Sequence, residues 1–245
     1  MRNIKIVLEY DGTRYHGWQR QGDRTTIQRV LEESIRTITQ EDIRIAGSGR
    51  TDAGVHALNQ VANFKTNSNI AARNLLNGIN SLLPGDIVVT ELMETDTAFH
   101  ARYDAKSKVY LYQILNRPVR SALYRHYAWF IREALDIDRI REATGLLIGT
   151  YDFSSFCASN CGITNHVRTV INTDVEMNQR SMIKIYVEAN GFLKYMVRNI
   201  VGTLVDVGRG KLSSTEFKGI VEAKDRRRAG MTAPACGLFL KKVKY

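Results

Sequence analysis

The chain has 245 residues, of which 44% are hydrophobic and 24% charged, and its formal net charge is +10. This is an ordinary globular balance, and the length suffices for one large domain or two small ones. No stretch approaches the roughly 20 apolar residues of a membrane span, and the N-terminus lacks the apolar core of a signal peptide. The positive charge favours a polyanionic partner, with nucleic acid first and an anionic membrane second, although a generic basic surface is the simpler alternative.

The first part of the chain mixes predicted strands and helices. Residues 4–10 alternate as a strand does and end at the turn signal Asp11-Gly12. Thr25 and Gln28 form a candidate capping box for the next helix. The elements predicted after it are a helix over 27–38, short strands over 43–46 and 61–64, a helix over 71–80 and a strand over 87–93.

The second part repeats this pattern. Asp136 can cap a helix that runs to about residue 147, and Ser213 with Glu216 forms a capping box for a helix that ends near residue 223. Apolar residues at helical spacing predict a further helix over 193–208. The predicted strands of this part cover residues 108–115, 127–131, 170–177 and 182–189.

The order of these elements lacks the regular strand–helix alternation of a parallel barrel. It predicts an α+β fold with antiparallel sheets and helices packed on one face. We place the boundary near residues 100–107, which gives an N-terminal α+β domain over residues 1–105 and a C-terminal α+β domain over residues 106–245. Two such halves would leave a central cleft between their sheets, in which a nucleic acid could lie.

The three cysteines, Cys157, Cys161 and Cys236, include no C-x-x-C pair. An odd number of cysteines without that motif is typical of free thiols in a reducing compartment, so we expect a cytoplasmic protein. A zinc site that combines cysteines with His166 is an alternative, but we judge its spacing poor for zinc.

A glycine-rich loop, GSGRTDAGVHA at residues 47–57, surrounds Arg50 and Asp52 with glycines. It differs from the dinucleotide fingerprint because Asp52 stands where the third glycine should be. Asp52 could be a nucleophile, a general base, a metal ligand or the cap of a turn. Because the loop holds no other acid and Arg50 is two residues away, we favour a metal-free site in which cations keep the carboxylate ionised.

Aromatic and basic side chains interleave over residues 10–21 and 99–103. This mixture is typical of surfaces that stack on bases and contact phosphates. The alternative is that the Tyr and Trp side chains of residues 10–21 fold back into the core. The basic run at residues 224–228 could likewise follow a phosphate backbone or simply end a helix.

Tyr110 and Tyr112 share one face of a predicted strand, where one could stack on a base or both could be core tyrosines with satisfied hydroxyls. Arg198 lies within the apolar helix, where a guanidinium is costly unless it meets an anion. A carboxylate from another element is its natural partner, so we predict that Arg198 pairs with Asp52. The alternative places Arg198 on the exposed face of the helix.

Six motifs, in order along nearly the whole chain, resemble those of the tRNA pseudouridine synthase A family. GRTDAGVHA at residues 49–57 is similar to its signature loop. The others are the opening motif at 10–21, FHAR at 99–102 with YxYxI at 110–114, DFSSF at 152–156, GFL through MVR to VG at 191–202, and APAxGL at 233–238. One departure is Tyr151, where the family commonly has His; it bears on RNA preference rather than on catalysis.

The resemblance implies an enzyme that isomerises uridine to pseudouridine in tRNA, at positions 38, 39 and 40 of the anticodon stem-loop, without metal or cofactor. It also implies a homodimer with RNP/ferredoxin-like halves flanking each cleft. By motif, Asp52 corresponds to the catalytic aspartate, Tyr110 to the tyrosine that contacts the target uracil, and Arg50 and Arg198 to basic residues around the aspartate. A non-catalytic RNA-binding protein and a metal-dependent nuclease are the competing hypotheses; the first gives Asp52 no role, and the second lacks an acidic cluster near it.

Overall fold

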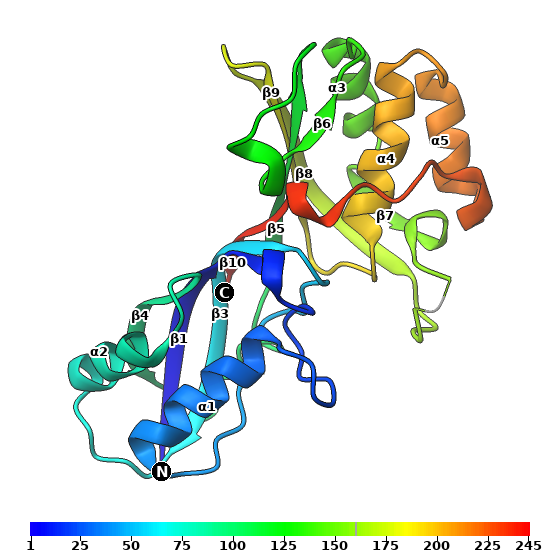
Figure 1. Cartoon of the computed structure of the whole chain (residues 1–245). Helices are drawn as coiled ribbons and strands as arrows, with labels where there is room; N and C mark the ends of the chain where they lie inside the picture. Colours follow the sequence, from blue (N-terminus) through cyan, green and yellow to red (C-terminus); the bar gives the residue numbers. More distant parts are fainter. Residues whose placement is uncertain (160) are drawn as a thin grey trace. The chain divides into compact units, whose positions relative to one another are not determined.

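The computed structural model describes residues 1–159 and 161–245. These residues divide into two compact units (Figure 1): unit 1 comprises Met1–Lys106 and Phe239–Tyr245, and unit 2 comprises Ser107–Leu238. Both units combine mainly antiparallel strands with helices, which confirms the predicted α+β class. The chain leaves unit 1 after Lys106 and returns to it at Phe239. The sequence analysis had assigned all residues after 105 to the C-terminal domain and did not indicate this return.

Unit 1 contains a sheet with the strand order β4-β1-β3-β10. Its strands are β1 (Arg2–Tyr10), β3 (His56–Thr66), β4 (Ile87–Thr95) and β10 (Leu238–Lys244), and the short β2 (Ala46–Gly47) pairs with β3. The central strand β1 is antiparallel to both β3 and β4, whereas β10 runs parallel to β3. The parallel β10 departs from the predicted antiparallel pattern, and local sequence did not indicate this strand.

Two helices complete unit 1, α1 (Ile27–Thr39) and α2 (Ala72–Leu82). They pack so closely that a Cβ on Gly78 would lie 3.1 Å from Cδ1 of Ile38. The helix α1 begins at Ile27 as predicted, but its predicted capping box is wrong, because Thr25 is not the N-cap. Thr26 is the N-cap, and its Oγ1 accepts the backbone N–H of Arg29 at 3.4 Å.

Unit 2 contains the strands β5 (Ser107–Asn116), β6 (Trp129–Ile131), β7 (Gly149–Asp152), β8 (Val167–Met177) and β9 (Met182–Ala189). β5 pairs with β9, β9 with β8 and β8 with β7, all antiparallel. The short β6 pairs with β5 in the parallel sense. The predicted strands are therefore present, and β7 is an addition that the sequence did not indicate.

The helices of unit 2 lie side by side (Figure 1): α3 (Ile137–Gly145), α4 (Met196–Gly208) and α5 (Ser214–Ala223). Every residue of α4 is buried except Arg198 and Asp206, as its apolar sequence predicted. The predicted capping box of α5 is confirmed, since Ser213 and Glu216 bond reciprocally. Single-turn 3-10 helices occupy Gly12–Arg14, Tyr124–His126, Ser154–Phe156, Arg226–Arg228 and Ala235–Gly237.

The cysteines differ from the sequence expectation. Cys157 and Cys161 form a disulfide, and Cys236 is a free thiol. The short loop brings the two Cα atoms to 6.5 Å, within the range that a disulfide spans. Within residues 1–159 and 161–245, no helix combines the length and the apolar character that a membrane crossing needs.

Candidate active site

The glycine-rich loop connects β2 to β3 in unit 1 and turns sharply at Asp52. The backbone carbonyl of Asp52 accepts the N–H of Val55 at 3.1 Å, and Gly54 takes a positive φ of 77° that a side chain would strain. Asp52 is half-buried and Arg50 is exposed. The loop thus holds its carboxylate residue at a defined place while leaving part of it open to a ligand.

The opening motif packs directly against this loop. The N–H of Trp18 donates to the Thr51 carbonyl at 3.0 Å, and the N–H of Gly54 donates to the Tyr15 carbonyl at 3.3 Å. Gly17, at φ 88°, comes so near that a Cβ would lie 2.6 Å from the Thr51 oxygen. The backbone on both sides of Asp52 is therefore fixed by a segment more than thirty residues away in the sequence.

Gln60 of β3 is a positioning residue that the sequence analysis missed. Its side chain is fully buried; Nε2 donates to the Gly49 carbonyl at 2.9 Å, and Oε1 accepts from Ser48 Oγ at 2.6 Å. On the same side of the loop, Tyr10 Oη and Thr51 Oγ1 are 2.8 Å apart. The only sequence signal for Gln60 is its amide side chain directly before the predicted strand at residues 61–64.

The aromatic residues of the opening motif are not available for stacking on bases. Tyr10, Tyr15 and Trp18 are each at most 7% exposed, so the alternative that they fold back into the core is correct. Burial raises the pKa of Tyr10 well above its ordinary value. The side chains that this motif leaves exposed are basic or polar: Thr13, Arg14, His16, Arg20 and Gln21.

The segment around residues 99–103 offers an exposed aromatic residue instead. Nδ2 of Asn3 donates to the Phe99 carbonyl at 2.9 Å, and Oδ1 of Asn63 accepts the N–H of Ala101 at 2.9 Å, so two buried amides anchor the segment to the sheet. Tyr103 is 75% exposed, and the guanidinium carbon of Arg102 lies 5.8 Å from its ring centre. This pair has the aromatic and cationic character that an unpaired nucleotide can contact.

Two tyrosines of β5 have different environments in unit 2. The hydroxyl of Tyr112 donates to the Pro234 carbonyl at 2.7 Å, and burial raises the pKa of this hydroxyl. Tyr112 is therefore a core tyrosine with a satisfied hydroxyl, as the alternative interpretation of this strand expected. Tyr110 is 7% exposed and meets the ring of Phe192 edge-on, with ring centres 4.9 Å apart. Tyr110 is as buried as Tyr15, so its contact with a base rests on the family motif and stays a prediction.

Arg198 lies in the first turn of α4 and is half-buried. Its Nε donates to the Ala233 carbonyl at 2.7 Å, and its guanidinium carbon lies 4.8 Å from the ring centre of Tyr195. Tyr195 has the left-handed backbone φ of 63°, a strained conformation that is enriched at functional sites. Because Asp52 belongs to unit 1 and Arg198 to unit 2, their pairing stays a prediction.

The basic run at residues 224–228 follows the end of α5 and has two roles. Arg226 turns inward, where its guanidinium donates to the side chains of Asn199 and Thr232 at 3.1 Å each. Arg227 pairs with Asp225, and hydrogen bonds from Arg227 lower the pKa of that carboxyl to about 2. Arg226 is therefore a structural cation, and the neighbouring arginines are the ones left at the surface.

Comparison with known proteins identifies the family of the chain. The sequence profile of the family described as tRNA pseudouridine synthase matches residues 6–104 and 143–245. The chain belongs to the tRNA pseudouridine synthase family. It is an enzyme of this family, an isomerase that acts on uridine in tRNA. The matched residues include Arg50, Asp52 and Arg198, whereas Tyr110 lies between the two matched segments.

Relatives of this synthase family resemble the chain over its whole length. It is 50% identical to tRNA pseudouridine synthase A of Thermoanaerobacter sp. (strain X514), over 100% of both chains. It is 46% identical to tRNA pseudouridine synthase A of Caldicellulosiruptor bescii and to tRNA pseudouridine synthase A 2 of Clostridium perfringens, again over 100% of both chains. The alignments therefore include residues 105–142 and, with them, Tyr110.

The synthase loop can perform carboxylate chemistry, since Asp52 combines partial exposure with a braced backbone. Its neighbours Ser48, Thr51 and Gly54 form hydrogen bonds that hold the loop. Among the described residues, the group of His, Cys, Asp and Glu side chains compact enough to hold a metal is Cys157, Cys161 and His166. That group lies in unit 2 and includes no residue of the glycine-rich loop.

Proposed function

We propose that this synthase isomerises uridines 38, 39 and 40 in the anticodon stem-loop of tRNA and that Asp52 is its catalytic carboxylate. The observation that carries the proposal is the half-buried Asp52 at the tip of a turn whose flanking backbone is bonded to Tyr15 and Trp18. Such bracing fixes a reacting group in the geometry that a transition state needs. The loop also lies within the segment that matches the family.

The reaction breaks the C–N glycosidic bond, turns the uracil and forms a C–C bond, with loss of the proton from C5. Asp52 could attack C1′ of the sugar, attack C6 of the base or remove a proton from the sugar, and all three routes need an ionised carboxylate. The target nucleotide must first leave its stack, because the reacting atoms are otherwise out of reach.

The substrate contacts that we propose follow from the family motifs. Arg50 and Arg198 supply positive charge near the carboxylate and the phosphates, which favours the ionised form of Asp52. Tyr110 contacts the target uracil, and its hydroxyl could help carry the proton lost from C5. No metal or cofactor takes part in this proposed chemistry.

We further propose a homodimer that works in the cytoplasm, where its tRNA substrate is found. The dimer rests on the family resemblance, and sedimentation of the purified protein tests it.

Replacing Asp52 by Asn tests the assignment. We expect tritium release from tRNA that carries [5-³H]uridine to fall about a thousandfold or more, because an amide cannot act as the nucleophile or base. Mapping of pseudouridine in the same tRNA reports whether positions 38, 39 and 40 are the ones modified. Asp42→Asn is the matched control, because it makes the same change at an exposed carboxylate of unit 1.

Two readouts separate the competing explanations. The Asp52→Asn protein should keep the wild-type melting curve and bind tRNA with similar affinity, as expected when only the reacting group is lost. Full tritium release by a folded Asp52→Asn protein would remove Asp52 from the mechanism. Binding of tRNA by the wild type without any tritium release would support the non-catalytic alternative instead.

A further inference from the structure

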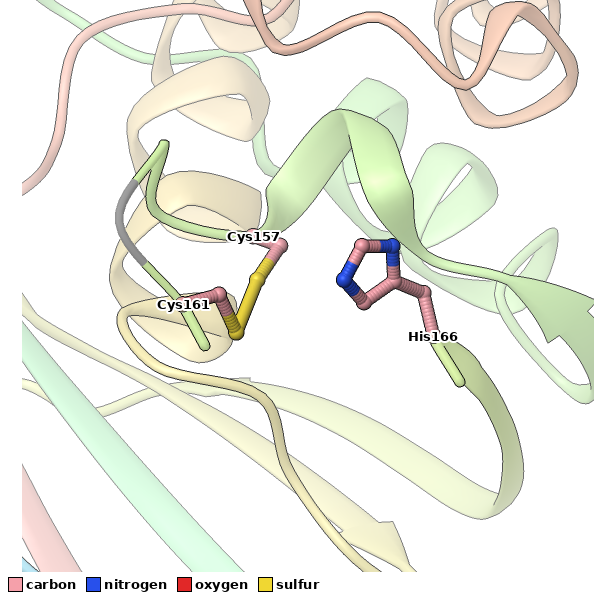
Figure 2. A group of neighbouring side chains, drawn as sticks. All are labelled: Cys157, Cys161 and His166. Carbon is pink, nitrogen blue, oxygen red and sulfur yellow. A yellow bond between two sulfur atoms is a disulfide. The ribbon is translucent and has the colours of Figure 1, made fainter. Parts of the chain in front are cut away.

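The loop between β7 and β8 in unit 2 collects two thiols and an imidazole that the proposed reaction does not use. Cys157, Cys161 and His166 each offer one ligand atom, and these atoms lie within 4.8 Å of one another. Figure 2 shows the imidazole ring turned toward the sulfur atoms. Cys157 and Cys161 form a disulfide, so their sulfur atoms are an oxidised pair here and can serve as ligands once they are reduced.

The hydrogen bonds of His166 determine which of its nitrogens carries the proton. Ser154 Oγ lies 2.5 Å from Asp152 Oδ1 and 2.7 Å from His166 Nδ1. A serine hydroxyl has one proton, and an ionised carboxylate can only accept, so Ser154 donates to Asp152. Ser154 must then accept from Nδ1–H of His166, so in the neutral imidazole Nε2 carries no proton and its lone pair is available.

That lone pair has no partner in the described structure. Nε2 of His166 is buried, and no described residue forms a hydrogen bond with it. A buried acceptor without a partner costs about 1–3 kcal/mol relative to a satisfied one. A metal ion is a natural partner, because metal-binding histidines typically donate their other N–H to a fixed acceptor, as His166 does to Ser154.

We propose that Cys157, Cys161 and His166 bind Zn²⁺ when the two cysteines are reduced. Two thiolates and one imidazole are a donor set that zinc prefers. The sequence analysis judged the spacing poor for zinc, but the fold brings the three ligand atoms together, and the C-x₃-C spacing itself lies in the range of structural zinc sites. A phosphine or thiol reductant supplies the two electrons that open the disulfide, and zinc then displaces the two thiol protons. The three protein ligands leave the fourth tetrahedral position to a water molecule.

The metal would brace the approach to α4. The N–H of Ala158 donates to the Lys194 carbonyl at 3.0 Å, and Nδ2 of Asn199 donates to the Phe156 carbonyl at 2.7 Å. The cysteine loop is thus already bonded to residues on both sides of Arg198, Lys194 before it and Asn199 after it. A zinc ion would link this loop to β8 through His166 and reduce its freedom.

The test uses the whole protein reduced with a phosphine, freed of reductant without oxygen and titrated with Co²⁺ and then Zn²⁺. We expect one metal ion per chain, a thiolate-to-cobalt charge-transfer band and loss of that band as Zn²⁺ replaces Co²⁺. We also expect Zn²⁺ to protect two of the three thiols from alkylation, with Cys236 still reactive. Reduced wild-type protein with three titratable thiols and no bound metal would overturn the proposal.

Variants locate the site and do not depend on the catalytic assignment. Cys161→Ser and His166→Gln should each weaken cobalt binding at least tenfold, and Ser154→Ala should weaken it about 10- to 100-fold because it releases the imidazole. Cys236→Ser is the matched control and should bind as the wild type does. Undiminished binding by a Cys157→Ser/Cys161→Ser double variant would place the metal elsewhere and refute the assignment.

Discussion

At the scale of single residues, the environment of Asp52 depends on groups to which the proposed reaction assigns no chemical role. Gln60 bonds two successive residues of the loop, Ser48 and Gly49, from a fully buried position on β3. A buried amide with both ends bonded fixes its partners, because breaking either bond leaves a buried polar group unsatisfied. Gln60 is therefore expected to act on catalysis through the position of the loop.

Gln60→Met, which keeps the volume and removes both bonds, tests this role. We expect a loss of about 1–3 kcal/mol in the free energy of unfolding, from the unpaired Ser48 and Gly49 groups. We also expect kcat to fall roughly tenfold to a hundredfold, since a small displacement of a reacting group has effects of that size, whereas KM changes little. Steady-state kinetics and urea unfolding measure the two effects.

The control for this variant is Gln179→Met, the same change in an exposed turn of unit 2. It should leave both quantities near the wild-type values. Wild-type kcat in a Gln60→Met protein would mean that the loop keeps its geometry without this amide.

At the scale of secondary-structure elements, α4 packs closely against the segment around Met231, which precedes β10. This close approach is possible because Gly202 of α4 has no side chain. A Cβ on Gly202 would overlap the carbonyl oxygen of Met231, so the helix and this segment are in backbone contact. The N–H of Ala233 also donates to the Arg198 carbonyl at 3.1 Å, one turn earlier on the same helix. The placement of Arg198 therefore depends on this close packing.

Gly202→Ala should destabilise unit 2, although alanine is the better helix former. The added methyl group cannot be accommodated without a backbone shift, and overpacking of this kind costs typically 1–3 kcal/mol. Gly219→Ala in α5 is the matched control, because nothing lies within 4 Å of its Cβ position. It should stabilise by up to about 1 kcal/mol through helix propensity.

Urea unfolding followed by circular dichroism measures both glycine variants. Opposite signs for the two substitutions are the expected result. Equal stabilisation by both would show that α4 and the Met231 segment are less tightly packed than the structure describes.

At the scale of the whole molecule, the dominant property is the net charge of +10. Part of this charge is internal, as in Arg226, but many cations are exposed, among them Arg14, Arg50 and Arg102. Exposed cations that neutralise phosphates release counterions, so binding depends steeply on salt. The charge therefore bears on tRNA binding and not on the fold.

The affinity for tRNA should fall roughly a thousandfold between about 50 and 200 mM salt, the effect of six or more phosphate contacts. Filter binding or fluorescence titration over that range measures the slope. The Asp52→Asn protein should show nearly the same slope, because one charge in the loop changes few phosphate contacts. A flat salt response would mean that the basic surface does not face the RNA.

Much of this protein follows from its sequence alone, because the signals are local. Helical periodicity and capping residues predicted α4 and the start of α5, since both depend on residues within a few turns of one another. The order of six short motifs identified the family, and the family comparison confirmed it. Asp52, Tyr110, Arg50 and Arg198 were likewise identified from motifs, and their roles stay predictions.

Only the tertiary structure decided features that depend on distant parts of the chain. Trp18 and Tyr15 are buried where the opening motif packs against the glycine-rich loop. The strand β10 forms because its partner, β3, lies beside it. The availability of the lone pair on Nε2 of His166 depends on the hydroxyl of Ser154, which contacts Nδ1 of the same ring and lies twelve residues earlier. Sequence patterns report propensity and periodicity along the chain, whereas exposure, parallel pairing and the tautomer of an imidazole are set by neighbours in space.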